Sequence, residues 1–174
     1  VGFVYENMDD LDAVFATTRA GYVYPRYGSP TVAAFENAVA SLEQGQAAHA
    51  FSTGMAAIHA ALLAAGARAG TTIVAAQDVY GATTVLVARL MKELGVSTQS
   101  VDVTDVQAVE KIVEQTKPVA LIAETISNPL LKVADISALA AITHRYGAQL
   151  LIDNTFASPY LCNPLALGAD YVIH

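Results

Sequence analysis

Four short stretches place polar or aromatic side chains at the ends of apolar runs. They are residues 52–55 (STGM), 78–81 (DVYG), 124–128 (ETISN) and 153–155 (DNT). The apolar runs before them are short and rich in Val, Ile, Leu and Ala, which indicates buried strands. Ligands of α/β sheets bind at the carboxyl ends of the strands. The sequence therefore predicts that these stretches form one site.

The first stretch is suited to binding an anion. Gly54 stands where a predicted strand turns into a helix, so backbone N–H groups at the start of the helix can face a negatively charged group, helped by the helix dipole. A phosphate would fit there. An ordinary tight turn with a hydroxyl cap is an equally good explanation of the same residues.

Tyr80 and Asp153 could bind a flat cationic ring. Tyr80 follows a predicted strand and precedes Gly81, which leaves room for an aromatic ring to lie over a flat ligand; a half-buried tyrosine without a ligand is the alternative. Asp153 ends the apolar run 149–152, where a carboxylate needs a partner, and a protonated ring nitrogen would be one. Alternatively, Asp153 caps the turn that follows it.

Asn128, Tyr24 and Arg26 are further candidates. Asn128 is restrained by Pro129 and could donate a hydrogen bond to a ring oxygen or a substrate carboxylate, although Asn-Pro also commonly starts a turn. Tyr24 and Arg26 precede the first predicted helix, and the planar guanidinium of Arg26 could chelate a phosphate. A solvated arginine is the alternative for Arg26.

Apolar runs alternate with stretches of helical period along the chain, which predicts successive βα units. No linker or internal repeat separates them. Strands are expected near 47–51, 71–76, 97–103, 119–124, 149–153 and 170–174, and helices near 30–44, 55–65, 83–94, 105–115 and 136–146. Such a pattern predicts an α/β fold, with a mostly parallel sheet flanked by helices on both faces.

The composition fits one globular domain and argues against several kinds of partner. Of the 174 residues, 54% are hydrophobic and 14% are charged, which is enough to bury a substantial core. A net charge of -7 repels nucleic-acid phosphates and anionic membrane surfaces. The longest apolar stretch, 55–67, is interrupted by His59 and is too short for a membrane span.

Cysteine usage and the N-terminus suggest where the protein works. One cysteine, Cys162, excludes an internal disulfide and agrees with a reducing, cytoplasmic compartment. The start VGFVYENMDD lacks the features of a secretory signal. Because it also lacks an initial Met, we expect the chain to be a fragment.

Other cofactor chemistries find little support in the sequence. No metal site is expected, because the histidines have no paired ligand spacing; they are His49, His59, His144 and His174. A nucleotide-binding α/β domain remains an alternative, but neither GxGxxG after a strand nor GxxxxGK[ST] is present.

The motifs YPRYGSPT, STGM, DVYGATT, ETISNP and DNTFASPY, taken in order, resemble those of the pyridoxal 5'-phosphate (PLP) enzymes of Cys/Met metabolism. This family includes cystathionine γ-synthase, O-acylhomoserine sulfhydrylases, cystathionine lyases and methionine γ-lyase. The resemblance covers essentially the whole chain. It implies PLP as cofactor and an aspartate-aminotransferase-like (fold type I) large domain.

The resemblance also implies roles for residues at matching positions. Gly54 and Met55 would bind the cofactor phosphate through their amides. Tyr80 would stack on the pyridine ring and assist proton transfer, as the catalytic residue. Asp153 would pair with the ring nitrogen, and Asn128 would lie near the phenolic oxygen of the ring.

Thr155 would support this site from beside it, by the same resemblance. Tyr24 and Arg26 would reach the phosphate bound by a neighbouring subunit, which requires a homo-oligomer, either a dimer or a dimer of dimers. The implied organisation is an N-terminal segment, 1–30, that serves the neighbouring subunit, and an incomplete PLP-binding large domain, 31–174.

Relatives continue beyond a segment like DYVIH with a Ser-X-Thr-Lys motif whose lysine forms the Schiff base, and we expect the same of the complete gene. The lysines of this sequence lie outside that motif and are interpreted as solvated surface residues; they are Lys92, Lys111, Lys117 and Lys132.

The resemblance predicts γ-replacement on an O-acylhomoserine, with elimination by a cystathionine lyase as the alternative. Ala82 stands where methionine γ-lyases tend to carry cysteine, which argues against that activity, and Ile126 stands where many relatives have proline. A non-catalytic remnant that still binds PLP is a further alternative.

Overall fold

The computed structural model describes residues 2–174, which divide into two compact units. One unit runs up to Ala50, and the other runs from Phe51 to His174. The predicted division after residue 30 concerns the assembled enzyme and stays a prediction.

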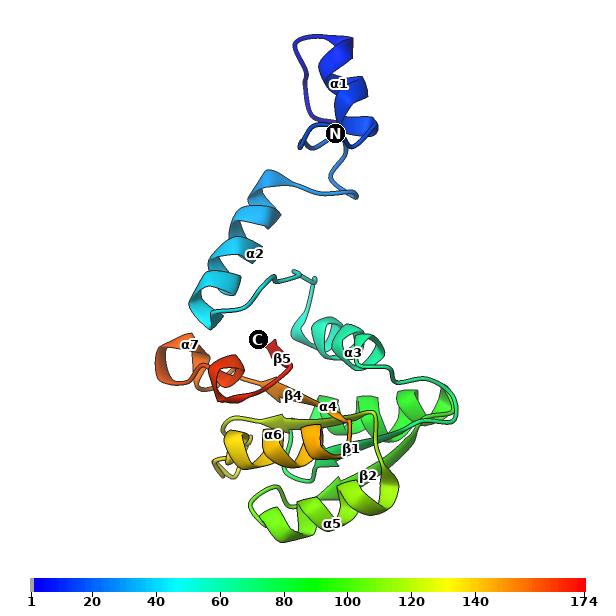
Figure 1. The fold of residues 1–174 in the computed structure, drawn as a ribbon, viewed down its shortest axis with the longest axis vertical. Coiled ribbons are helices and arrows are strands. Elements are labelled where there is room, and N and C mark those ends of the chain that lie inside the picture. Colours follow the sequence, from blue (N-terminus) through cyan, green and yellow to red (C-terminus); the bar gives the residue numbers. More distant parts are fainter. Residues whose placement is uncertain (1) are drawn as a thin grey trace. The chain divides into compact units, whose positions relative to one another are not determined.

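The N-terminal unit contains helices α1 (Met8–Phe15) and α2 (Pro30–Glu43) (Figure 1). The Asn7 side chain caps α1 by accepting a hydrogen bond from the Asp10 N–H, at 2.8 Å. Pro30 occupies the first turn of α2, where its fixed φ suits a helix and its missing N–H costs nothing. Helix α2 was expected from the sequence, whereas α1 was not.

Residues 47–51, which were expected to form a strand, are coil. The segment is mostly alanine, which is depleted in strands. Residues 2–50 contain no strand with which it could pair.

The second unit is built on a sheet of five parallel strands in the order β2-β1-β3-β4-β5. The strands are β1 (Thr72–Ala76), β2 (Ser97–Val101), β3 (Ala120–Glu124), β4 (Gln149–Asp153) and β5 (Tyr171–Ile173). Each neighbouring pair is parallel. The predicted fold class, a mostly parallel sheet joined by helices, is confirmed.

Helices cover both faces of the sheet, and all but α3, which precedes β1, connect its strands (Figure 1). They are α3 (Gly54–Ala64), α4 (Gly81–Val85) with a π-helical continuation (Leu86–Met91), α5 (Val106–Thr116), α6 (Ile136–Arg145), α7 (Ser158–Leu161) and the 3-10 helix η2 (Pro164–Leu167). Within residues 2–174, no helix has both the length and the apolar character needed to cross a membrane.

The apolar strands contribute side chains to two separate hydrophobic cores, because successive residues of a strand point to opposite faces of the sheet. On one face, Leu121 and Leu150 pack with residues of α5 and α6 such as Val109. On the other face, Ile122 and Leu151 pack with residues of α3 and of the π-helical turn. Burying one such side chain contributes about 1.5–3 kcal/mol, which explains why these strands are continuously apolar.

Three helices of the second unit begin with a side-chain cap. Thr53, Asp105 and Asp135 cap α3, α5 and α6, each accepting a hydrogen bond from the N–H three residues further on. Replacing such a cap with alanine costs about 1 kcal/mol. The cap of α3 fixes the direction in which its first amides point.

The sheet register brings the ends of three strands together. Glu124 at the end of β3 pairs with Asp153 at the end of β4, and Asp153 pairs with Ile173 of β5. Because all the strands are parallel, the loops that follow them lie at the same edge of the sheet.

Candidate functional site

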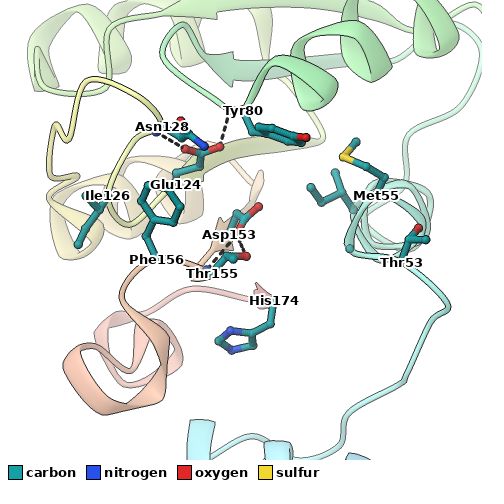
Figure 2. A pocket seen from close by; sticks show the side chains of 12 residues that line it. Thr53, Met55, Tyr80, Glu124, Ile126, Asn128, Asp153, Thr155, Phe156 and His174 are labelled. Atoms are coloured by element: carbon teal, nitrogen blue, oxygen red, sulfur yellow. Dashed lines mark hydrogen bonds between the residues drawn. The ribbon is translucent and has the colours of Figure 1, made fainter.

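A cavity of about 420 Å³ lies at this edge of the sheet, entirely within the second unit (Figure 2). Residues that the sequence predicted for the site line it: Gly54, Met55, Tyr80, Asn128, Asp153 and Thr155. The rest of the lining consists of Thr53, Ile58, Glu124, Ile126, Phe156 and His174. Residues more than a hundred positions apart in sequence, such as Gly54 and Thr155, therefore meet here.

The start of α3 points two backbone donors towards an open position. The first N–H groups of a helix have no intrahelical carbonyl partner. Thr53 satisfies two donors of this turn, with Oγ1 accepting from the Ala56 N–H and the carbonyl accepting from the Ala57 N–H, both at 3.1 Å. Within the described residues 2–174, the N–H groups of Gly54 and Met55 have no hydrogen-bond partner.

The Asp153 carboxylate is bonded through only one of its oxygens. Its Oδ1 accepts from the Thr155 N–H at 3.0 Å and from the Thr155 hydroxyl at 2.5 Å, as the dashed lines in Figure 2 show. Its Oδ2 accepts no hydrogen bond from a donor within residues 2–174. Asp153 thus caps its turn, one of the two possibilities left open by the sequence, and still has one oxygen for a ligand.

Glu124 connects two loops that border the cavity. Its Oε1 accepts from the Tyr80 N–H at 2.5 Å, and its Oε2 accepts from the Asn128 N–H at 2.8 Å. The residue is only 8% exposed. This burial raises the pKa of Glu124, with a smaller contribution in the same direction from the charge of Asp153; the two hydrogen bonds oppose the rise.

Glu124 lies in one of the stretches predicted to form the site, but no role was predicted for it from the sequence. The signal was present, because Glu124 ends the apolar strand β3 in the same way that Asp153 ends β4. A carboxylate at such a position requires a partner. The sequence did not indicate that the partners would be backbone N–H groups.

Tyr80 borders the cavity with its ring and is half exposed, at 51%. In Figure 2 its ring extends from the loop after β1, with the hydroxyl turned towards Met55. Ile126 and Phe156 add apolar surface across the cavity. The site therefore combines an aromatic wall, apolar lining and a few polar groups, as small-molecule sites usually do.

Lys132 is not the solvated surface lysine that we expected. Its ammonium lies 2.6 Å from Asp78 Oδ2 and 3.0 Å from Asp102 Oδ2, and these hydrogen bonds raise the pKa of Lys132. The pKa of Asp102 falls to about 2, chiefly because the Thr104 hydroxyl and N–H donate to it and then because Lys132 does. The interpretation is confirmed for the exposed lysines, which are Lys92, Lys111 and Lys117.

Tyr24 and Arg26 belong to the N-terminal unit. The Arg26 guanidinium lies over the rings of Tyr24 and Tyr27, at 5.4 and 5.7 Å from their centroids. A cation in such a position is attracted by the ring faces. Their role towards a neighbouring subunit stays a prediction.

Residues 2–174 contain no group of three or more His, Cys, Asp or Glu side chains placed to hold a metal ion. The polar groups of the cavity are backbone amides, hydroxyls, an amide side chain, carboxylates and the imidazole of His174. These groups suit an organic ligand that carries both an anion and a cationic ring.

Comparisons with known proteins give the chain its family. Residues 1–174 match the model of the Cys/Met metabolism PLP-dependent enzymes. A cystathionine β-lyase of Lactococcus lactis subsp. cremoris (strain MG1363) is 46% identical over 156 residues, which are 88% of this chain and 40% of the relative. A cystathionine γ-synthase of Mycobacterium bovis is 44% identical over 157 residues, 90% of this chain and 40% of the relative.

A solved structure shows the same fold. It is a putative O-acetylhomoserine (thiol)-lyase from Campylobacter jejuni with N'-pyridoxyl-lysine-5'-monophosphate; the TM-score is 0.86 and the identity 29%, covering 98% of this chain and 42% of that chain. This chain thus spans about two fifths of the length of the proteins it matches. The family match and the parallel sheet agree, and the chain belongs to the PLP-dependent enzymes of Cys/Met metabolism, of fold type I.

Proposed function

We propose that the cavity binds PLP and that the intact protein uses it for γ-replacement on an O-acylhomoserine, with a sulfur nucleophile displacing the acyl group. One observation carries the proposal. A single cavity in a chain of this family holds two helix-start amides, the Tyr80 ring and an unbonded oxygen of Asp153.

The residues present fit the cofactor at three points. The amides of Gly54 and Met55, at the positive end of the α3 dipole, would hold the phosphate. The Tyr80 ring would lie against the pyridine ring, and Asp153 Oδ2 would accept from the protonated ring nitrogen. The volume of about 420 Å³ lies within the usual range for small-molecule sites.

PLP, when bound, supplies an electron sink for negative charge that develops on the amino-acid substrate. The Asp153 carboxylate would keep the ring nitrogen protonated, while Thr155 holds the other carboxylate oxygen in place. The Tyr80 hydroxyl would hold and transfer a proton. Asn128 would donate to a ring oxygen or to the substrate carboxylate.

The proposal extends to the assembly. Tyr24 and Arg26, in the segment 1–30, would reach the phosphate bound by the large domain, 31–174, of a neighbouring subunit, so the enzyme would work as a cytoplasmic homo-oligomer. No lysine within residues 2–174 lines the cavity. None of these lysines is therefore assigned as the residue that binds the cofactor covalently.

Elimination is the second candidate reaction. The identity to the Lactococcus cystathionine β-lyase, 46%, is slightly above the identity to the Mycobacterium cystathionine γ-synthase, 44%. In β-elimination the Cβ–S bond of cystathionine breaks and homocysteine leaves as the thiol. The remaining three-carbon enamine then hydrolyses to a 2-oxo acid, pyruvate, and ammonia.

Product analysis of the intact protein with PLP separates the two candidates. One reaction receives O-acetylhomoserine or O-succinylhomoserine with cysteine, and the other receives cystathionine. We expect the first to yield cystathionine and one carboxylate per turnover, detected by mass spectrometry. A higher kcat/KM for release of ammonia and a 2-oxo acid from cystathionine would overturn γ-replacement in favour of elimination.

A further inference from the structure

The two loops that carry Tyr80 and Asn128 are tied together at two points. The Tyr80 loop comprises residues 77–80, between β1 and α4, and the Asn128 loop comprises residues 125–133, after β3. One tie, through Glu124, is buried beside the cavity. The other, through Lys132, lies outside it.

The inner tie uses both oxygens of one carboxylate. Glu124 accepts from the N–H of Tyr80 and from the N–H of Asn128 through different oxygens, as Figure 2 shows. A carboxylate can accept at both oxygens at once, whereas a carboxamide has one accepting oxygen and a donating nitrogen. Glutamine at this position could therefore satisfy only one loop.

The outer tie joins the same loops through charge. Lys132 of the Asn128 loop pairs with Asp78 of the Tyr80 loop and with Asp102, which follows β2. Within its own loop Lys132 is fixed by Ser127, whose hydroxyl accepts from the Lys132 N–H at 3.1 Å and whose N–H donates to the Lys132 carbonyl at 2.9 Å. Movement of Lys132 would thus be transmitted to the residue next to Asn128.

Because the Tyr80 side chain is half exposed, its position depends on the hydrogen bonds of its backbone. With half of its side chain uncovered, Tyr80 is placed mainly by its backbone, which is bonded to Glu124. Asn128 is likewise bonded through its N–H to the same carboxylate. A shift of either loop would move a side chain that borders the cavity.

We propose that Glu124 and Lys132 are positioning residues that hold the Tyr80 and Asn128 loops as one unit at the edge of the cavity. The effect on cofactor binding rests on the proposed PLP site, but the coupling of the loops does not. Because the two ties act in parallel, each limits the damage when the other is lost. Loss of both then costs more than the sum of the single losses.

Amide hydrogen exchange in the intact protein without PLP tests the coupling. The variants are Glu124→Gln, Lys132→Met and their combination, with Glu114→Gln and Lys111→Met as matched controls at exposed positions of α5. We expect faster exchange at the Tyr80 and Asn128 amides, about tenfold for Glu124→Gln. In the double variant, the acceleration of exchange should exceed the product of the two single effects. A further variant, Lys132→Arg, keeps the positive charge and should exchange as slowly as wild type.

The dissociation constant for PLP, measured on the same proteins, tests the consequence. We expect a rise in the single variants, a larger rise in the double variant and no change in the controls. Exchange rates equal to the controls, or multiplicative effects in the double variant, would overturn the coupling. A wild-type protein that does not bind PLP would refute the proposed cofactor site instead, while the exchange data would still decide the coupling.

Discussion

One oxygen of the Asp153 carboxylate is bonded to Thr155, and the other meets no donor within residues 2–174. A charge-assisted hydrogen bond from a ring nitrogen to this oxygen would contribute roughly 1.5–3 kcal/mol. Asp153→Ala in the intact protein should therefore lower kcat by orders of magnitude without unfolding it, because the protonated electron sink is lost. Circular dichroism checks the fold. Near-normal turnover in the folded variant would show that Asp153 only caps its turn.

Glu124 imposes a pH dependence whose sign follows from burial. Its pKa in the native protein is raised above the ordinary 4.5, so the native state binds the proton more tightly than the unfolded chain. The stability contributed by Glu124 is therefore greatest below pH 4.5 and is lost as pH rises through the raised pKa. Glutamine does not titrate, so the free energy of unfolding of Glu124→Gln minus that of wild type should increase as pH rises from 4.5 through the raised pKa.

Denaturant unfolding of the intact protein at a series of pH values measures this difference, with Glu114→Gln as the exposed control. Only the change with pH is diagnostic, since the lost hydrogen bond shifts the whole curve. A difference between Glu124→Gln and wild type that stays flat or falls with rising pH would contradict a raised pKa.

The ion pair between Lys132 and Asp102, which joins two loops, predicts how the pKa of Asp102 changes when Lys132 is replaced. The pKa of Asp102, lowered to about 2 from 3.8, depends first on the Thr104 hydroxyl, then on the Thr104 N–H and then on Lys132. Lys132→Met should raise this pKa only part of the way to 3.8, because the two hydrogen bonds from Thr104 remain. Carbon-13 NMR titration of the Asp102 carboxyl measures the change. A full return to 3.8 in Lys132→Met would show that Lys132 alone lowers the pKa.

Local sequence signals were sufficient for most elements of the second unit. Continuous apolar runs predicted β1, β3 and β4 because both faces of these strands are covered. Glycines at Gly95 and Gly147, both with positive φ, ended helices where expected. The π-helical turn after α4 was not predicted, because it has no signature in local composition, and the coil at 47–51 was mistaken for a strand although its alanines disfavour one.

Contacts between distant residues set the limit of sequence inference at the site. Asp153 could be predicted as a binding residue from its place at the end of an apolar strand. The pairing of Lys132 with Asp78 and Asp102, which are 54 and 30 residues away, depends on the strand order and on the path of the Asn128 loop. Neither can be read from the local sequence, and Lys132 was therefore misinterpreted.

For the whole molecule, the proposed sharing of sites between subunits predicts complementation. Arg26→Ala and Asp153→Ala proteins, each nearly inactive alone, should regain activity when refolded together as intact chains. One site of a mixed dimer would combine an intact Asp153 with an intact Arg26 from the other chain, and the second site would carry both lesions. Turnover after confirmed subunit exchange is the measurement. No gain would reject the shared-site model, because sites made within one chain would each keep a lesion.

Binding of PLP through the start of α3 can be tested at Gly54. Proline there removes the N–H and puts its ring Cδ in the place of the amide hydrogen, but it does not oppose the helix, since proline suits the first helical position and Thr53 has the extended conformation that proline requires of its predecessor, with φ -152 and ψ 152. Gly54→Ala is the matched control. It keeps the N–H, and its Cβ would lie 3.5 Å from the His174 carbonyl oxygen, an ordinary contact.

The measurement is the dissociation constant for PLP of the intact protein and of both variants, from the change in absorbance on titration. We expect wild type and Gly54→Ala to bind PLP with similar affinity. Gly54→Pro should bind it about tenfold or more weakly, because one charge-assisted hydrogen bond to the phosphate is lost. Equal affinity of Gly54→Pro and Gly54→Ala, or no binding by the wild-type protein, would contradict this expectation.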